Sequence, residues 1–141
     1  LQQLKKLPDL DAARRKNFKR MKEIFEPYAE YLHLPEATDK ADPCWFAFLM
    51  TVKEDAPFKR HKLVAHLESN RIQTRSYFAG NILAHPGYSE IAEEYGDIQE
   101  AFPIASHVTL NSFFLGTFIG LTDEKLDYIQ KVVDEFFKDI K

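Results

Sequence analysis

Eight consecutive residues, Trp45–Val52 (WFAFLMTV), form an almost uninterrupted apolar run between two segments with helical periodicity. The run is short and rich in strand-forming residues, so it predicts a buried strand covered on both faces. Ile72–Phe78 and Phe113–Phe118 predict two further strands, and Gly116 in the last of them indicates a bulge or a close approach of another backbone. Three short strands among helices predict an α+β domain, with a small, mostly antiparallel sheet and helices packed mainly on one face.

The helical segments around these strands each carry one apolar face. In the first segment this face consists of Leu10, Phe18, Met21, Phe25, Tyr28 and Leu32. We expect Asp9 to cap its start and Pro27 to interrupt it, because proline removes a backbone donor. Phe58–Asn70 predicts a second helix, closed by Asn70 in the left-handed conformation. Thr122 is expected to cap the last helix, whose apolar stripe is Leu126, Ile129, Val133, Phe136, Phe137 and Ile140.

Segments rich in turn-forming residues connect these elements. A loop over Leu34–Pro43 and a turn at Gly80-Asn81 are expected from their prolines, glycine and asparagine. Tyr88–Tyr95, closed by Gly96, and Pro103–Leu110 predict short helices.

The bulk composition limits the classes of function. The chain has 141 residues, one domain's length, and a net charge of −3, which gives no electrostatic case for nucleic acid or an anionic membrane. No apolar run is long enough to span a bilayer. One cysteine, Cys44, excludes an internal disulfide framework, and we expect a reducing, cytoplasmic location. The five histidines show no i,i+3 or i,i+4 pair, so no intrinsic metal site is predicted. The chain lacks an initiator methionine and is expected to be cut from something longer.

Arg75 and Asn81 are the candidate binding residues, and each has two interpretations. Arg75 in its strand, followed by Tyr77 and Phe78, is expected to be partly buried, and a buried arginine needs a partner. That partner is either one of the domain's own carboxylates or a phosphate or carboxylate ligand. Asn81 either stabilises the turn through its side chain or presents its amide to a hydroxylated ligand. Trp45 and Tyr77 are either core residues or weaker supports of the same site.

Several segments resemble the C-terminal part of nucleotide-sugar 3-dehydratases in the DegT/DnrJ/EryC1/StrS aminotransferase family, a branch of the fold-type I pyridoxal phosphate (PLP) enzymes. They are Trp45–Phe48, Leu67–Arg75, Phe78–Asn81 and His85-Pro86. Phe113–Gly116, Gly120–Thr122 and Leu126–Ile129 resemble the closing strand and last helix of that family. Arg14, Arg15 and Asn17 resemble the helix that enters the small domain. The resemblance implies a division into residues 1–33, a helix leading from a missing large domain, and residues 34–141, the small C-terminal domain.

The resemblance also implies a reaction. It is the removal of the C3 hydroxyl from a nucleotide-linked 4-keto-6-deoxyhexose in dideoxysugar and lipopolysaccharide O-antigen biosynthesis. The cofactor is PLP or its amine form PMP, whose ring acts as the electron sink. The family's catalytic groups lie in the large domain, so no catalytic residue is assigned here and the isolated chain is expected to be inactive and free of cofactor. Arg75 and Asn81, with Tyr77 and Trp45 in support, are implied to face the cofactor or the sugar nucleotide.

The implied partners are the large domain of the same chain, the nucleotide-sugar substrate, a second copy in a homodimer and a reductase. Some family members carry an iron–sulfur cluster, which Cys44 alone cannot supply. Two other functions stay open: the small domain of a related nucleotide-sugar aminotransferase, and a non-catalytic binding or oligomerisation module. Without a large domain, the apolar face of the first helix is expected to be exposed.

Overall fold

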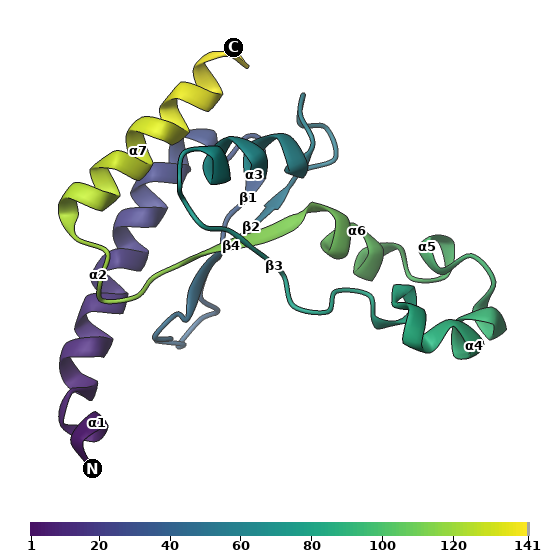
Figure 1. Ribbon diagram of the computed structural model, residues 1–141, viewed down its shortest axis with the longest axis horizontal. Coiled ribbons are helices and arrows are strands. Elements are labelled where there is room, and N and C mark those ends of the chain that lie inside the picture. The colour runs from purple at the N-terminus through teal and green to yellow at the C-terminus, as the bar shows by residue number, and fades with distance from the viewer. Residues whose placement is uncertain (141) are drawn as a thin grey trace.

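A four-stranded antiparallel sheet, covered on one face by three helices, forms the body of the protein (Figure 1). This computed structural model describes residues 1–140. Its elements are α1 (Gln2–Lys5), α2 (Leu7–Phe25), η1 (Glu26–Tyr28), β1 (Leu32–His33), β2 (Ala47–Val52), α3 (Arg60–Ser69), β3 (Arg75–Ser76), η2 (Ile82–Ala84), η3 (Pro86–Tyr88), α4 (Ser89–Ala92), η4 (Glu93–Tyr95), α5 (Ile98–Ala101), α6 (Pro103–Asn111), β4 (Ser112–Gly116) and α7 (Asp123–Lys138). The predicted α+β class is confirmed.

The strands lie in the order β1-β2-β4-β3, so the central pair is β2 and β4. The edge strand β1 was not predicted, because two residues are too few to show a strand pattern. Phe48, Met50 and Val52 of β2 are buried, whereas the alternate residues are half-buried. The prediction that both faces of this strand are covered is therefore wrong: in the described chain the helices pack on one face.

The other two predicted strands are shorter than expected. β4 ends at Gly116, which pairs in register with Ala47, so the predicted bulge is absent from the β2–β4 ladder. β3 contains only Arg75 and Ser76, because the chain turns away at Phe78, whose φ is +43°.

One core cluster unites α2, α3, α7 and the buried side of the sheet. Its largest buried side chains are Phe25, Phe48, Phe113, Phe137, Met21, Ile24, Leu32, Met50, Leu63, Leu67, Leu115 and Leu126. The expectation of an exposed apolar face on the first helix is wrong from Asn17 onward, because that face packs against β2 and α7. The core thus contains residues from both predicted parts of the chain, 1–33 and 34–141. The role of the first helix as a link to a large domain stays a prediction.

The helix ends are set by the local sequence, and two of the capping positions differ from the predicted ones. α2 begins at Leu7, so Asp9 lies in its first turn rather than at the cap, and it ends at Phe25, before Pro27 as predicted. The left-handed residue after α3 is Arg71 (φ +60°), not Asn70, whose side chain instead donates to the carbonyl of His66. Thr122 caps α7 as predicted, accepting a hydrogen bond from the Lys125 amide.

Residues 77–111 leave the sheet after β3 and return at β4, and we call them the arm. Figure 1 shows the arm projecting from the body on the side away from α2 and α7. Its short helices include both predicted ones, and Gly96, with φ +68°, closes η4. Among the described residues, helices with the length and hydropathy needed to cross a bilayer are absent.

Candidate functional site on the open face of the sheet

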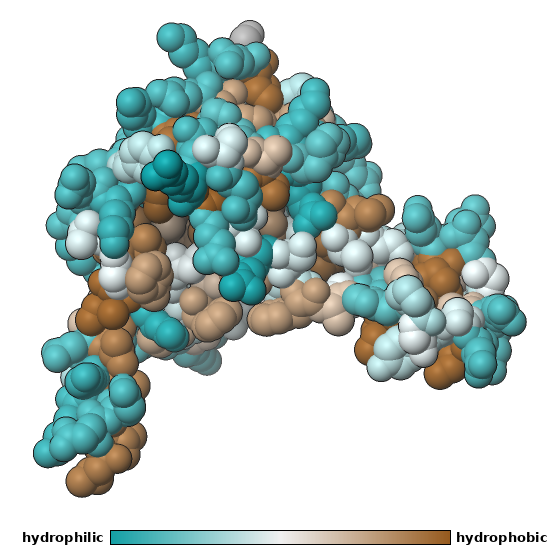
Figure 2. All heavy atoms as spheres, in the orientation of Figure 1, coloured by the Kyte–Doolittle hydropathy of each residue, from teal (hydrophilic) through white to brown (hydrophobic). Residues whose placement is uncertain are grey.

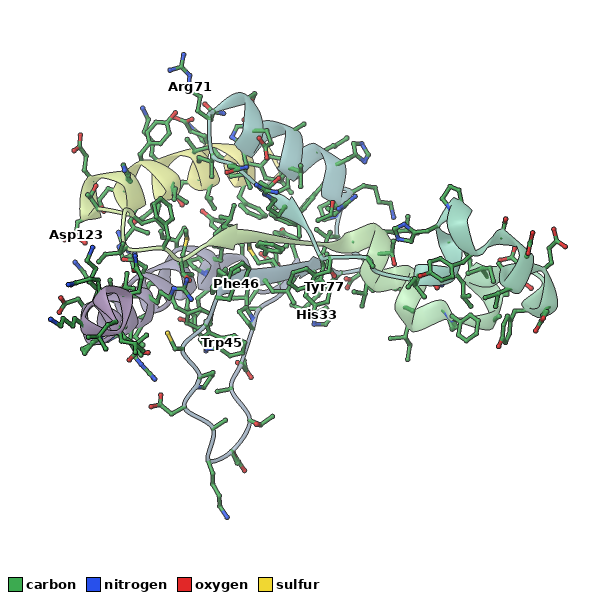
Figure 3. The ribbon with its side chains drawn as sticks, turned by 60° about the horizontal axis from the view of Figure 1, so that its bottom comes forward. His33, Trp45, Phe46, Arg71, Tyr77 and Asp123 are labelled. Atoms are coloured by element: carbon green, nitrogen blue, oxygen red, sulfur yellow. The ribbon has the colours of Figure 1, made fainter. Side chains whose placement is uncertain are left out.

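The side of the sheet turned away from α2, α3 and α7 is called here the open face. Antiparallel partners directly opposite each other point to the same side of a sheet. Arg75 pairs with Phe114, which in turn pairs with Leu49, and His33 pairs with Thr51. On β1, β2 and β4 the residues next to His33, Leu49, Thr51 and Phe114 include buried ones that point into the core, so these four residues line the open face. β3 has no buried residue, and Arg75 is placed on the open face by its pairing with Phe114. In Figure 3, which brings this side forward, Phe46, Tyr77 and His33 lie over the strands.

A row of aromatic rings crosses the open face. The Phe114 ring lies 6.0 Å from that of Phe46 and 5.8 Å from that of Phe78, and Phe78 lies 5.2 Å from Tyr77. Phe46 is 61% exposed and Phe78 is 72% exposed. The Arg14 guanidinium lies 5.9 Å from the centre of the Phe46 ring, within cation–π range. Contiguous exposed apolar surface of this kind marks a binding surface. We call these four rings the aromatic row.

Arg75 lies beside this row on the edge strand β3. Its side chain is exposed, so the predicted partial burial is wrong, since an edge strand has no neighbour on its outer side. Arg75 forms no ion pair within 4.0 Å of any carboxylate in residues 1–140. The structural ion pair considered as one interpretation is therefore absent from the described chain, and the guanidinium is available to a ligand.

Two side chains that sequence reasoning missed hold β3 in place. Glu68 at the end of α3 accepts hydrogen bonds from the backbone amide (2.5 Å) and hydroxyl (2.8 Å) of Thr74, directly before Arg75. These bonds lower the pKa of Glu68, and the nearby charge of Arg75 lowers it further. Arg60 donates to the hydroxyl of Ser76 (3.3 Å) and to the Ser112 carbonyl (3.2 Å), joining β3 to β4. The position of Arg75 is thus fixed by contacts on both sides.

Asn81 lies apart from this site, at the base of the arm. It is 5% exposed; its Oδ1 accepts from the Leu83 amide at 3.2 Å, and its Nδ2 donates to Ser106 Oγ at 3.2 Å. Its backbone amide donates to Thr109 Oγ1 at 2.6 Å. These contacts match the interpretation of Asn81 as a turn-stabilising residue. The side chain also lines a cavity of about 310 Å³ within the arm.

The two aromatic candidates differ in their surroundings. Tyr77 is 37% exposed and closes one end of the aromatic row. Trp45 is half-buried, and its ring stacks on Phe18 of α2 at 5.0 Å, so it packs mainly against the helical layer. Of the four predicted site residues, the structure brings Arg75 and Tyr77 together, places Trp45 nearby, and separates Asn81.

The titratable side chains show no metal centre. In residues 1–140, groups of three or more histidine, cysteine or acidic side chains placed to hold a metal ion are absent. His66 and His85 are each within 2.9 Å of a backbone carbonyl, of Val132 and Ala79 respectively. Cys44 is exposed beside Asp11, whose carboxylate raises the pKa of the thiol.

The open face combines a free guanidinium with flat apolar rings. A guanidinium binds phosphate or carboxylate through paired hydrogen bonds, and aromatic rings pack against planar or apolar groups. The open face is therefore suited to binding and positioning.

The sequence matches the model of the DegT/DnrJ/EryC1/StrS aminotransferase family over residues 1–134, and the chain belongs to this family. The chain is 38% identical over 136 residues to dTDP-4-dehydro-2,6-dideoxy-D-glucose 3-dehydratase of Saccharopolyspora spinosa, an alignment covering 96% of this chain and 29% of that protein. It is 36% identical over 137 residues to the lipopolysaccharide biosynthesis protein RfbH of Salmonella typhimurium, covering 97% and 31%.

The fold comparison agrees. The E. coli GDP-4-keto-6-deoxy-D-mannose-3-dehydratase, solved with bound hydrated PLP, superposes with a TM-score of 0.70 at 30% identity, covering 94% of this chain and 33% of that one. The predicted resemblance is confirmed. The chain spans about a third of the length of these relatives, which fits the C-terminal part of a longer protein.

Proposed function

We propose that this chain is the small C-terminal domain of a PLP- or PMP-dependent nucleotide-sugar 3-dehydratase. The observation that carries this proposal is the similarity, along nearly the whole chain, to relatives named as 3-dehydratases and to one named for lipopolysaccharide biosynthesis. The substrate class is a nucleotide-linked 4-keto-6-deoxyhexose, which loses its C3 hydroxyl.

The open face is the part of this domain that we assign to the active-site cleft. When bound, the cofactor supplies an electron sink for breaking the bond at C3 of the sugar. Arg75 would bind a phosphate of the cofactor or of the nucleotide, since it is exposed and lacks an ion pair with any described residue. The aromatic row would pack against the large domain or the ligand and exclude water. No proton transfer is assigned to a residue of this chain.

The remaining implied features are part of this proposal. Tyr77 and Trp45 support the ligand site, whereas Asn81 acts through the base of the arm. A homodimer and a reductase partner are expected for the whole protein. Any iron–sulfur cluster there requires cysteines other than Cys44.

The test is to incubate the whole protein with PMP and a nucleotide-linked 4-keto-6-deoxyhexose and to follow the sugar by mass spectrometry. Loss of the C3 hydroxyl supports the proposal. An amino sugar that keeps this hydroxyl, formed with an amino donor, would establish the aminotransferase instead. Binding without either product would leave a non-catalytic module. A cofactor absorbance band formed by this chain alone would contradict the view that it supplies only part of the site.

A further inference from the structure

The turn between α3 and β3 is held together by one carboxylate, that of Glu68. α3 ends at Ser69, and Arg71 after it adopts the left-handed conformation, with φ at +60°. The Oε1 atom of Glu68 accepts a hydrogen bond from the backbone amide of Thr74 at 2.5 Å and another from its hydroxyl at 2.8 Å. The Glu68 side chain thus spans the turn and fixes the residue directly before Arg75.

Glu68 itself belongs to a helix that is firmly packed. Leu63 and Leu67 on the inner side of α3 are fully buried in the core. On the side of α7, the Nε2 atom of His66 lies 2.9 Å from the Val132 carbonyl oxygen, within hydrogen-bond distance. Figure 2 shows a mostly hydrophilic surface over α3, so the apolar side of this helix is the side that packs. A side chain on such a rigid element is suited to positioning its neighbours.

The strand β3, by contrast, has few contacts of its own. It consists of Arg75 and Ser76, both exposed, and it pairs with β4 alone. An edge segment with so few buried contacts opens more easily than a core strand. Side-chain bonds support it at both ends, from Thr74 to Glu68 and from Arg60 to Ser76. The place of the Arg75 guanidinium therefore depends on Glu68.

The Glu68 contact acts through hydrogen bonding rather than through an ion pair. In residues 1–140, Glu68 forms no ion pair within 4.0 Å. Both bonds from Thr74 end on the same oxygen, Oε1. Glutamine has nearly the same shape, and its carbonyl oxygen can accept the same two bonds without the charge. Glu68→Gln therefore separates the effect of hydrogen bonding from that of charge.

We propose that Glu68 is a positioning residue for the phosphate site of Arg75. Through Thr74, it sets the place of β3 and hence the point at which the Arg75 guanidinium meets a phosphate of the cofactor or of the nucleotide. The role of Glu68 rests on the proposed function, in which Arg75 binds such a phosphate. A guanidinium binds phosphate through two parallel hydrogen bonds, so a small displacement of its strand weakens both.

The test is ligand binding by the whole protein, measured separately for the two sources of phosphate. The dissociation constant of PMP is measured by absorbance, and those of UDP, CDP, GDP and dTDP are measured by calorimetry. Arg75→Ala should raise the dissociation constant of one of these two classes by about tenfold or more, and that class identifies the phosphate. Glu68→Ala should raise the same constant by about fivefold or more and leave that of the other class unchanged.

Three further variants show how Glu68 acts. Glu68→Gln, which keeps the acceptor oxygen, should bind within about twofold of wild type. Thr74→Val loses only the hydroxyl bond, so its affinity should lie between those of wild type and Glu68→Ala. The matched control, Glu135→Ala, removes an exposed carboxylate of α7 whose ion pair with Lys131 spans 3.9 Å, and it should bind like wild type. Thermal unfolding confirms that each variant is folded, and Thr74→Val carries the comparison if Glu68→Ala does not fold.

The double variant, Glu68→Ala with Arg75→Ala, decides whether Glu68 acts through Arg75. If it does, the double variant should bind no more than about twofold more weakly than Arg75→Ala alone. Effects that multiply, wild-type binding by both Glu68→Ala and Thr74→Val, or a Glu68→Gln variant as weak as Glu68→Ala would each overturn the role of Glu68 and leave the dehydratase proposal in place. An Arg75→Ala variant that binds both classes like wild type would overturn the assignment of Arg75 in the proposed function, and the role of Glu68 with it.

Discussion

At the scale of single residues, accessibility separates Arg75 from the candidates Asn81 and Trp45. Asn81 has its amide satisfied inside the domain, and Trp45 stacks on Phe18, so loss of either side chain acts first on folding. Arg75 is exposed, and its position is set by the hydrogen bonds of its neighbours Thr74 and Ser76 rather than by its own side chain. A change at Arg75 should therefore alter binding and leave stability nearly unchanged.

Arg75→Ala in the whole protein should lower kcat/KM by about tenfold or more while the melting temperature changes little, because a lost phosphate contact costs roughly 1.5–3 kcal/mol. Arg71→Ala is the matched control. Arg71 is also exposed and, in Figure 3, points away from the open face, so activity should be retained. The assay is steady-state kinetics alongside thermal unfolding. Equal activity losses in both variants, or unfolding of the Arg75 variant, would show a structural role.

Tyr28 is a buried tyrosine whose ionisation should lower the stability of the protein at alkaline pH. Its hydroxyl donates to Asp134 at 2.7 Å, and burial followed by this bond raises the pKa of Tyr28 to about 12. A pKa raised in the folded state stabilises the protein fully below pH 10, and this stabilisation is lost as pH rises toward 12. Tyr28→Phe, which keeps the stacking on Phe137, should cost about 1 kcal/mol below pH 10.

The measurement is urea unfolding of wild type and Tyr28→Phe from pH 7 to 12. The difference in unfolding free energy should shrink between pH 10 and 12. A difference that is constant over this range would show that the hydroxyl does not titrate as the buried contact requires.

At the scale of elements, the arm depends on one close approach at its base. A Cβ added to Gly80 would lie 2.4 Å from Thr109 Oγ1, and the φ of +60° is unfavourable for other residues. Gly80→Ala should therefore destabilise the arm by about 1–3 kcal/mol. Gly87→Ala, whose Cβ would meet no atom within 4 Å, is the matched control and should be nearly neutral.

This comparison is read by urea unfolding and by proteolysis of the arm. Gly80→Ala should be cut faster within residues 77–111, and Gly87→Ala should resemble wild type. Identical cleavage of the two variants would mean that the Gly80–Thr109 contact does not hold the arm.

At the scale of the whole molecule, stability should be unevenly distributed. The core joins β2 and β4 to three helices, whereas the arm consists of short helices that mainly contact one another. Amide hydrogens of β2 and β4 should exchange slowest, and those of α4 and α5 faster by on the order of a hundredfold or more. Mass spectrometry of hydrogen exchange tests this distribution. Equal protection of sheet and arm would show that they unfold as one unit.

The sequence by itself determined the features that depend on nearest neighbours. Pro27 ended α2, Thr122 capped α7, and the apolar spacing of residues 126–137 set the buried side of that helix. These follow from backbone donors, caps and helical periodicity, which are local. The family was also recognisable from the sequence, because it rests on residue order.

The tertiary structure alone decided how exposed the candidate site residues are. Only the pairing of strands placed Arg75 at an open edge beside Phe114, and only the return of the chain at Thr109 buried Asn81. The aromatic row joins residues more than sixty positions apart, so no local pattern could reveal it. Burial depends on contacts between distant segments of the chain. A sequence pattern shows the preference of a residue for burial, but it does not show which residue will cover it.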